Sequence, residues 1–225
     1  MEQLFTPLLI LHILGGSAGL ITGTIAASVK KGSKPHLVSG KIFFWGMFLA
    51  SSSALVLSWI PGHESLFLFA VGGFTLYMIL SGYRIVLLKR KSKQHNRTFF
   101  STDYLITLFG FSFAVFLLIQ SVKGLLNGNT FSIVPGVFGL ICLSYVLLDI
   151  RLITGNTTIK QSWLYNHIVR MMGAMIASYT AFLVVNVQID MQWILWLLPS
   201  VIGSIFITIF LRKYTLPKNN AHVKH

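Results

Sequence analysis

Seven long apolar segments are the feature that most restricts the fold of this 225-residue chain. Each is a continuous hydrophobic run of about twenty residues or more, which is the length that an α-helix needs to cross a bilayer. The segments cover residues 4–28, 36–60, 65–88, 101–124, 131–154, 162–187 and 191–212. The runs do not alternate between polar and apolar residues, which argues against membrane-spanning strands. The sequence predicts an all-α, polytopic bundle of seven transmembrane helices.

Composition and charge agree with this class of protein. The chain is 54% hydrophobic and 10% charged, with a mean hydropathy of +0.74, whereas soluble domains carry about 25% charged residues. A water-soluble fold is therefore excluded. The net charge of +13 does not indicate nucleic acid, because most of the basic residues lie in short loops between apolar segments. We expect the lipid bilayer as partner and no nucleic acid.

The basic residues also predict the orientation. Lysine and arginine are concentrated after the first, third, fifth and seventh segments, whereas the opposite loops hold Lys123 as their one basic residue. Cytoplasmic loops carry such an excess, so the N-terminus is predicted outside and the C-terminus in the cytoplasm. The first segment is too long for a signal peptide and is expected to be a retained helix. Residues 1–212 are predicted to form one domain, and residues 213–225 a disordered cytoplasmic tail.

Ionisable residues inside the spans are the candidates for function, because such groups are costly in hydrocarbon and usually face the bundle interior. Besides Lys41 and Arg151, which could extend to the headgroups, they are His12, His36, Arg84, Asp103, Asp149, His167 and Arg170. All except His12 fall in the cytoplasmic third of the predicted bundle, on five helices, so we expect these six to meet in one cavity. His12 lies roughly 12 Å below the outer edge. His167 and Arg170 are three residues apart and share a helix face.

Structural interpretations stay open for several of these residues. Arg84 could extend to the lipid headgroups, Asp103 could cap its helix, and Asp149 could pair with Arg170. Glycines lie one turn beyond two of the imidazoles: Gly15 and Gly16 follow His12, with Gly19 one turn further, and Gly40 follows His36. They leave room for either a flat ligand or a closely packed helix.

Four motifs carry a resemblance. LHILGGSAGLITG, HLVSGKIFFW, LYMILSGYR and NHIVRMMGAMIASYTAFLVVN resemble a bacterial family of predicted multi-pass membrane proteins of unknown function, from the first helix to the sixth. The helices that combine histidine with glycine are also similar in style to the membrane subunits of b-type cytochromes. The resemblance implies a bacterial cytoplasmic (inner) membrane location and marks His12, His36, His167 and Arg170.

Four functions are compatible with these residues. The first is an electron-transfer oxidoreductase component that binds haem b through His36 and His167, with Arg84 and Arg170 holding the propionates. The second is an intramembrane zinc hydrolase, with His36, His167 and Asp103 or Asp149 as ligands. The third binds or transports an anionic amphiphile. The fourth is a structural role for an ion-pair network. A quinone or an amphiphilic small molecule is the expected diffusible partner, and His12 is a further candidate metal ligand.

Overall fold

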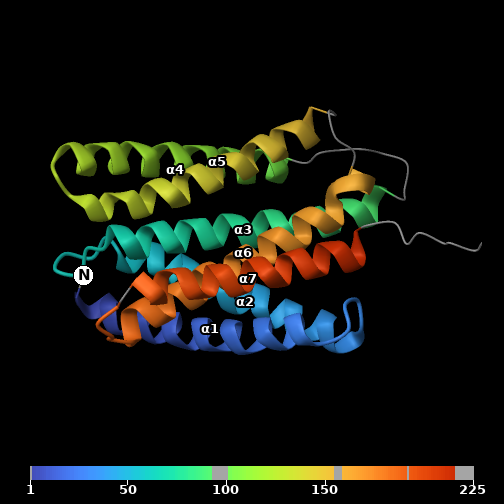
Figure 1. Ribbon diagram of the computed structural model, residues 1–225, viewed down its shortest axis with the longest axis horizontal. Helices are drawn as coiled ribbons and strands as arrows, with labels where there is room; N and C mark the ends of the chain where they lie inside the picture. The colour runs from blue at the N-terminus through green and yellow to red at the C-terminus, as the bar shows by residue number, and fades with distance from the viewer. Residues whose placement is uncertain (1, 93–100, 155–158, 192, 216–225) are drawn as a thin grey trace, which may run out of the picture.

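The structure, a computed structural model, describes residues 2–92, 101–154, 159–191 and 193–215. Seven α-helices and one short 3₁₀ helix make up this part of the chain, and the helices lie side by side along the long axis (Figure 1). They are α1 (Glu2–Ser28), α2 (Lys34–Leu57), α3 (Leu66–Ser92), α4 (Ser101–Leu126), η1 (Thr130–Ser132), α5 (Ile133–Ile153), α6 (Ile159–Asn186) and α7 (Trp193–Tyr214). All seven α-helices are long and apolar enough to cross a membrane. The predicted all-α bundle of seven spans is confirmed.

The helix boundaries differ from the predicted ones by a few residues, for local reasons. α2 begins earlier than predicted because Ser33 caps it, with its side chain accepting a hydrogen bond from the His36 amide. It ends at Leu57, and the chain then turns through Gly62, whose φ of +85° favours glycine. α7 continues to Tyr214, two residues past the predicted domain end. The remainder of the predicted tail, residues 216–225, lies outside the described residues.

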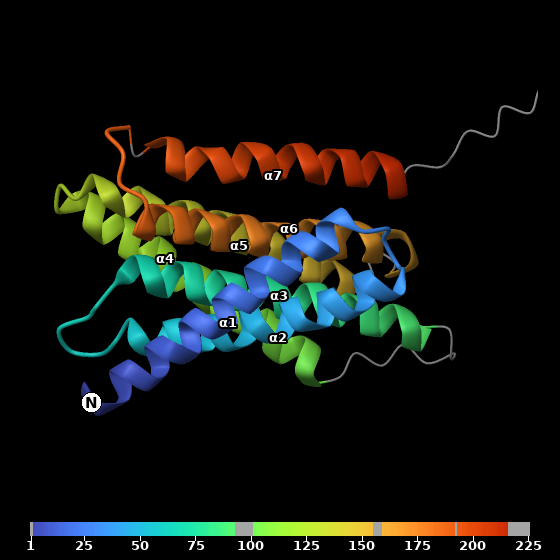
Figure 2. The same cartoon turned by 90° about the horizontal axis from the view of Figure 1, so that it is seen from below.

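The helices pack as three close pairs. α1 packs with α2, α4 packs with α5, and α3 packs with α6. α3 is the central helix, with contacts to α2, α4 and α5 as well as α6, whereas α7 packs chiefly on α6 (Figure 2 shows it at the edge of the bundle). The core is formed by side chains from α2 to α6, among them Met47, Tyr77, Phe113, Cys142 and Ala174.

Glycines set the distance between α1 and α2. A Cβ on Gly15 would lie 2.8 Å from the Gly46 carbonyl oxygen, and a Cβ on Gly46 would lie 2.7 Å from the Gly15 carbonyl oxygen. The glycines that follow His12 therefore serve close helix packing. Gly40, which follows His36, has no atom within 4 Å of a Cβ built on it. Gly40 therefore faces open space and not a closely packed helix.

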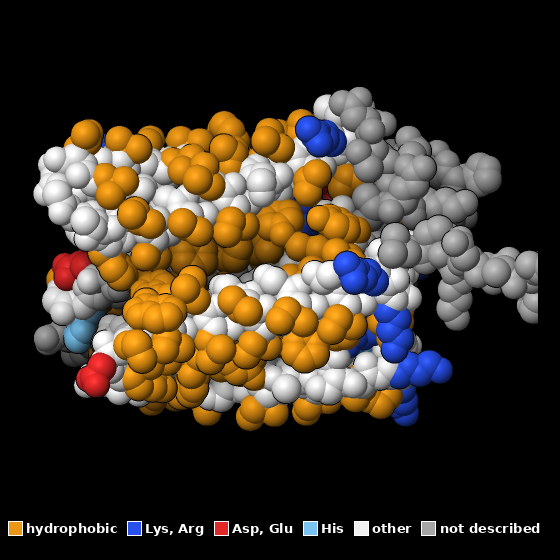
Figure 3. All heavy atoms as spheres, in the orientation of Figure 1, with side chains coloured by type: hydrophobic (Ala, Val, Ile, Leu, Met, Phe, Trp, Pro, Cys, Tyr) orange, Lys and Arg blue, Asp and Glu red, His pale blue; other side chains and the backbone are white. Residues whose placement is uncertain are grey.

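The surface charges separate to the two ends of the bundle. Figure 3 shows hydrophobic side chains along the length, lysine and arginine gathered at one end, and acidic side chains prominent at the other. The basic end contains the turn between α1 and α2 and the end of α7, both predicted to be cytoplasmic. The apolar sides of the bundle, between these two ends, suit the hydrocarbon core of a bilayer.

Candidate functional site

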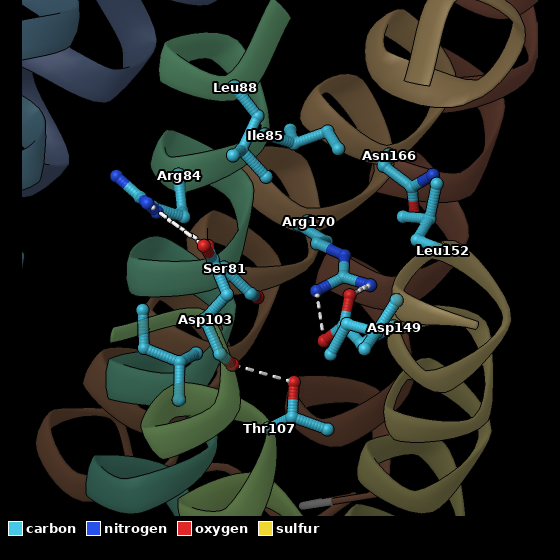
Figure 4. A pocket seen from close by; sticks show the side chains of 12 residues that line it. Ser81, Arg84, Ile85, Leu88, Asp103, Thr107, Asp149, Leu152, Asn166 and Arg170 are labelled. Atoms are coloured by element: carbon cyan, nitrogen blue, oxygen red, sulfur yellow. Dashed lines mark hydrogen bonds and ion pairs between the residues drawn. The ribbon is translucent and has the colours of Figure 1, made fainter. Parts of the chain in front are cut away.

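A small polar cavity lies near the basic end of the bundle, between α3, α4, α5 and α6 (Figure 4). Its volume is about 30 Å³. The lining side chains are Ser81, Arg84, Ile85, Leu88, Asp103, Ile106, Thr107, Asp149, Leu152, Ile153, Asn166 and Arg170. Four of the six residues predicted to converge therefore do so, one from each of the four helices.

Arg170 is the most deeply buried of the charged side chains, at 1% exposure. Its two terminal nitrogens donate to the two carboxylate oxygens of Asp149 at 2.6 and 3.0 Å, and one of them also donates to the Tyr145 carbonyl at 3.3 Å. The rings of Tyr77 and Tyr145 lie 5.7 and 5.4 Å from the guanidinium carbon, within cation–π range. The Nε atom of Arg170 is buried and has no hydrogen-bond partner among the described residues.

Asp149 is held from two helices at once. It receives Arg170 from α6, and the Tyr77 hydroxyl of α3 donates to it at 2.5 Å. The carboxylate is therefore the point where α5 is joined to α3 and α6. α5 and α6 make little close backbone contact, so long side chains connect them.

A second ion pair faces the first across the cavity. The Nε and a terminal nitrogen of Arg84 donate to the two oxygens of Asp103 at 2.5 and 2.9 Å, which joins α3 to α4. The Arg84 side chain is 17% exposed, so it pairs inside the bundle and does not extend alone toward headgroups. Asp103 lies in the first turn of α4, and its carboxylate accepts hydrogen bonds from Arg84.

The two pairs balance each other's charge. Among the described lining residues, two guanidinium groups are matched by two carboxylates, and each pair has the two-bond geometry that makes arginine–carboxylate contacts strong. The network gives each of these four charges, two buried and two half-buried, an opposite charge at hydrogen-bond distance. Because an unpaired charge in hydrocarbon is costly, this pairing is what makes the cluster tolerable inside a membrane.

The three histidines lie outside this cavity. The ring Nδ1 of His167 is 3.0 Å from the Gly82 carbonyl oxygen, that of His36 is 3.0 Å from the Ala26 carbonyl, and that of His12 is 2.9 Å from the Ala50 carbonyl. A carbonyl accepts only, so each Nδ1 carries the hydrogen and each Nε2 keeps its lone pair in the neutral ring. The expectation that His36 and His167 would line the same cavity as the ion pairs was wrong.

The side chains proposed as metal ligands contact different partners in the structure. Asp103 and Asp149 each face an arginine, while the imidazoles face backbone carbonyls. Among the described residues there is no group of three or more histidine, cysteine or acidic side chains placed to hold a metal ion. His12 bonds to the middle of α2, well away from His36 at the start of that helix.

Sequence reasoning missed two tyrosines of the site. Tyr77 precedes Arg84 by seven residues, which is two helical turns, and Tyr145 precedes Asp149 by four. Both spacings place the tyrosine on the same helix face as the charged residue. A tyrosine four or seven residues before an intramembrane charged residue was the sequence signal that could have identified both.

Fold and site together define a seven-helix membrane protein with a buried, charge-balanced polar cavity. No family model, no curated protein and no solved structure matches the chain. The resemblance to a bacterial membrane-protein family stays a prediction.

Proposed function

We propose that this protein binds an anionic amphiphile, with the headgroup at Arg84 and Arg170 and the apolar chain between the α4–α5 hairpin and the α3–α6 pair. The observation that carries the proposal is the cavity itself, where two arginines and other polar side chains share the lining with five aliphatic side chains. A polar end beside an apolar wall is the pattern that an amphiphile requires.

The surrounding surface suits an apolar chain. Figure 3 shows the molecule hollowed between α4–α5 and the helices beneath, with hydrophobic side chains along the hollow. The cavity lies at the basic end of the same junction, where Ile85, Ile106 and Leu152 line it. A chain in the hollow would bury apolar surface, and its head would reach the charged cluster.

Arg170 has donor capacity left for a ligand. Its Nε–H is buried without a partner in the described part of the chain, although the rest of its guanidinium is engaged. A buried donor left unsatisfied costs about 1–3 kcal/mol. A ligand oxygen, or a water that a ligand displaces, would recover that free energy.

A headgroup series tests the proposal. The purified protein is titrated with decanoate, decyl phosphate, decanol and decyltrimethylammonium, which share one chain and differ in charge. The anionic members should bind most tightly. The double variant Arg84→Gln/Asp103→Asn removes one guanidinium while keeping the cavity neutral, and it should weaken anion binding by roughly tenfold to a hundredfold, the value of a charged hydrogen bond.

Arg151→Gln is the matched control, because Arg151 lies on α5 with an exposed side chain and does not line the cavity. It should leave binding unchanged. Equal affinity for all four headgroups would contradict the proposal, as would equal losses in the cavity and control variants.

A haem or another iron centre at His36 and His167 is the second candidate. The observation that favours it is the hydrogen bond from each Nδ1 to a backbone carbonyl, the arrangement that fixes the tautomer of metal-binding histidines and presents Nε2. The open space at Gly40 lies one turn from His36. A zinc hydrolase would need a third ligand beside these two imidazoles. An absorption spectrum and metal analysis of one detergent-purified sample separate these cases.

A further inference from the structure

We propose that Lys31, in the turn between α1 and α2, and Lys213, near the end of α7, bind the phosphate of an anionic phospholipid. The proposal is separate from the cavity, because neither lysine lines it. Lys31 is half-buried and Lys213 is exposed, both at the basic end of the bundle. The partner is therefore a lipid with a net negative charge, whose headgroup lies at the edge of the bilayer and whose acyl chains lie in the hydrocarbon.

Lys31 connects the α1–α2 turn to α7. Its ammonium group donates hydrogen bonds to the carbonyl oxygens of Ala26 and Ala27 at the end of α1. The same nitrogen lies 4.3 Å from the centre of the Phe210 ring on α7, a favourable cation–π contact. An ammonium group has three N–H donors. Two are used by the carbonyls, so one is left for an acceptor from outside the chain.

Lys213 brings a second positive charge to the same place. It follows Phe210 by three residues, which puts the two on neighbouring parts of one face of α7. The pKa of Lys31 is lowered from its ordinary value, first by burial and second by the positive charge of Lys213. The two ammonium groups thus repel each other. A phosphate bound between them would replace this repulsion with two attractions.

The chain has no acidic side chain to spare for these lysines. Its five acidic residues are Glu2, Glu64, Asp103, Asp149 and Asp190. The second and third aspartates in the helices, Asp103 and Asp149, pair with arginines, and the other three acidic residues belong to the opposite end of the bundle. The anion that neutralises the lysines is therefore expected from a partner, and the headgroups of a cytoplasmic leaflet carry such charge.

A row of aromatic rings on α7 favours a lipid over a free anion. Phe206, Phe210 and Tyr214 follow one another at intervals of four residues, and successive rings are centred 6.0 and 6.5 Å apart. Phe206 is 46% exposed, on a helix that packs chiefly on α6 at the edge of the bundle. The row leads from the lysines into the apolar part of α7. An acyl chain can lie along it while the phosphate contacts Lys31 and Lys213, whereas inorganic phosphate would use the lysines alone.

Two lipids that differ only in headgroup test the proposal. Dioleoylphosphatidylglycerol is anionic, dioleoylphosphatidylcholine has no net charge, and binding of each to the detergent-purified protein is measured by native mass spectrometry. Phosphatidylglycerol should bind more tightly. Lys31→Gln/Lys213→Gln should weaken its binding by roughly tenfold to a hundredfold, the effect of losing a charged hydrogen bond, and should leave phosphatidylcholine unchanged.

Lys30→Gln/Arg212→Gln is the matched control. It removes the same charge from the two residues next in sequence, both exposed. These side chains lose only a general attraction to an anionic surface, so binding should weaken by at most about fivefold.

A charge reversal gives a second readout that a poorly folded variant could not imitate. Lys213→Glu supplies an anion beside Lys31 from within the chain. The lipid-free variant should therefore melt at a higher temperature than the unaltered protein, and phosphatidylglycerol should no longer stabilise it. Arg212→Glu changes the charge equally and should do neither.

Equal binding of the two lipids would overturn the proposal, as would equal losses in the test and control variants. Full displacement of phosphatidylglycerol by millimolar inorganic phosphate would show a free-anion site and overturn the assignment to a lipid. The cavity variant Arg84→Gln/Asp103→Asn should keep phosphatidylglycerol binding unchanged. A loss there, with none in the lysine variant, would place the lipid in the cavity and so support the proposed function while overturning this site.

Discussion

Arg170 on α6 and Asp149 on α5 form a two-bond ion pair, at 2.6 and 3.0 Å, around a guanidinium that is 1% exposed. This pair, the contact of Arg84 with Asp103 and the bond from Tyr77 to Asp149 are among the polar links that hold the α4–α5 hairpin to α3 and α6. In hydrocarbon there is no apolar driving force between helices, so such links carry much of the association. The same groups that stabilise the hairpin are those that a ligand would have to contact.

Removing one member of the buried pair should be far more damaging than removing both. Asp149→Ala leaves Arg170 buried without its anion and should lower the free energy of unfolding by about 3–5 kcal/mol. The double variant Asp149→Leu/Arg170→Met should recover most of this loss, because no charge is then left unpaired. Unfolding is followed by denaturant titration in micelles. A single variant as stable as the unaltered protein would show that water already solvates Arg170.

The Tyr77 hydroxyl should stabilise the site through its bond to Asp149. Tyr77→Phe keeps the ring and removes the hydroxyl that donates at 2.5 Å to a charged acceptor, so we expect a loss of about 1.5–3 kcal/mol. Tyr83→Phe, on the same helix, is the control, because the Tyr83 hydroxyl bonds to no described residue. Equal effects of the two substitutions would refute a specific role for Tyr77.

Two glycines on neighbouring helices should respond to alanine in opposite ways. A Cβ on Gly82 would lie 2.9 Å from the Cβ of Arg170, where α3 and α6 pack closely, so Gly82→Ala should cost about 1–3 kcal/mol. Gly40→Ala meets nothing within 4 Å and should be neutral or stabilising by up to about 1 kcal/mol. Thermal unfolding of both variants in the same detergent gives the comparison. If Gly82→Ala proved harmless, the close approach of the two helices would be in error.

His167 should be dispensable for insertion but required for any bound iron. Under the haem hypothesis, His167→Ala loses the Soret band while the protein is still inserted and folded. His12→Ala is the matched control, since His12 also bonds to a backbone carbonyl but lies away from His36. An unaltered protein that is intact and contains neither haem nor a stoichiometric metal would exclude the ligand role.

The orientation can be measured with reporter fusions in the turns at Gly32 and Gly128, both of which have positive φ and expose their backbone. The excess of basic residues predicts a cytoplasmic signal at Gly32 and an external signal at Gly128. The reverse pattern would place the candidate cavity on the outer side.

The apolar segments by themselves determined the seven helices, because a run of about twenty residues at 1.5 Å per residue crosses the bilayer whatever its neighbours are. The sequence also placed Arg84, Asp103, Asp149 and Arg170 at one depth, since depth follows from position along a helix. Depth alone does not specify which helices are neighbours or how each is rotated about its axis. The sequence therefore did not determine which aspartate pairs with which arginine.

Tertiary packing decided the partners. His167 and Arg170 differ by about 60° around α6, because each residue advances the helix by about 100°. In the packed bundle that angle is enough to direct His167 to the Gly82 carbonyl on α3 and Arg170 to Asp149 on α5. The small size of Gly82 lets α3 and α6 approach closely enough for this division. A shared face in the sequence thus became two separate sites, because α3 contacts one part of that face and Asp149 of α5 contacts the other.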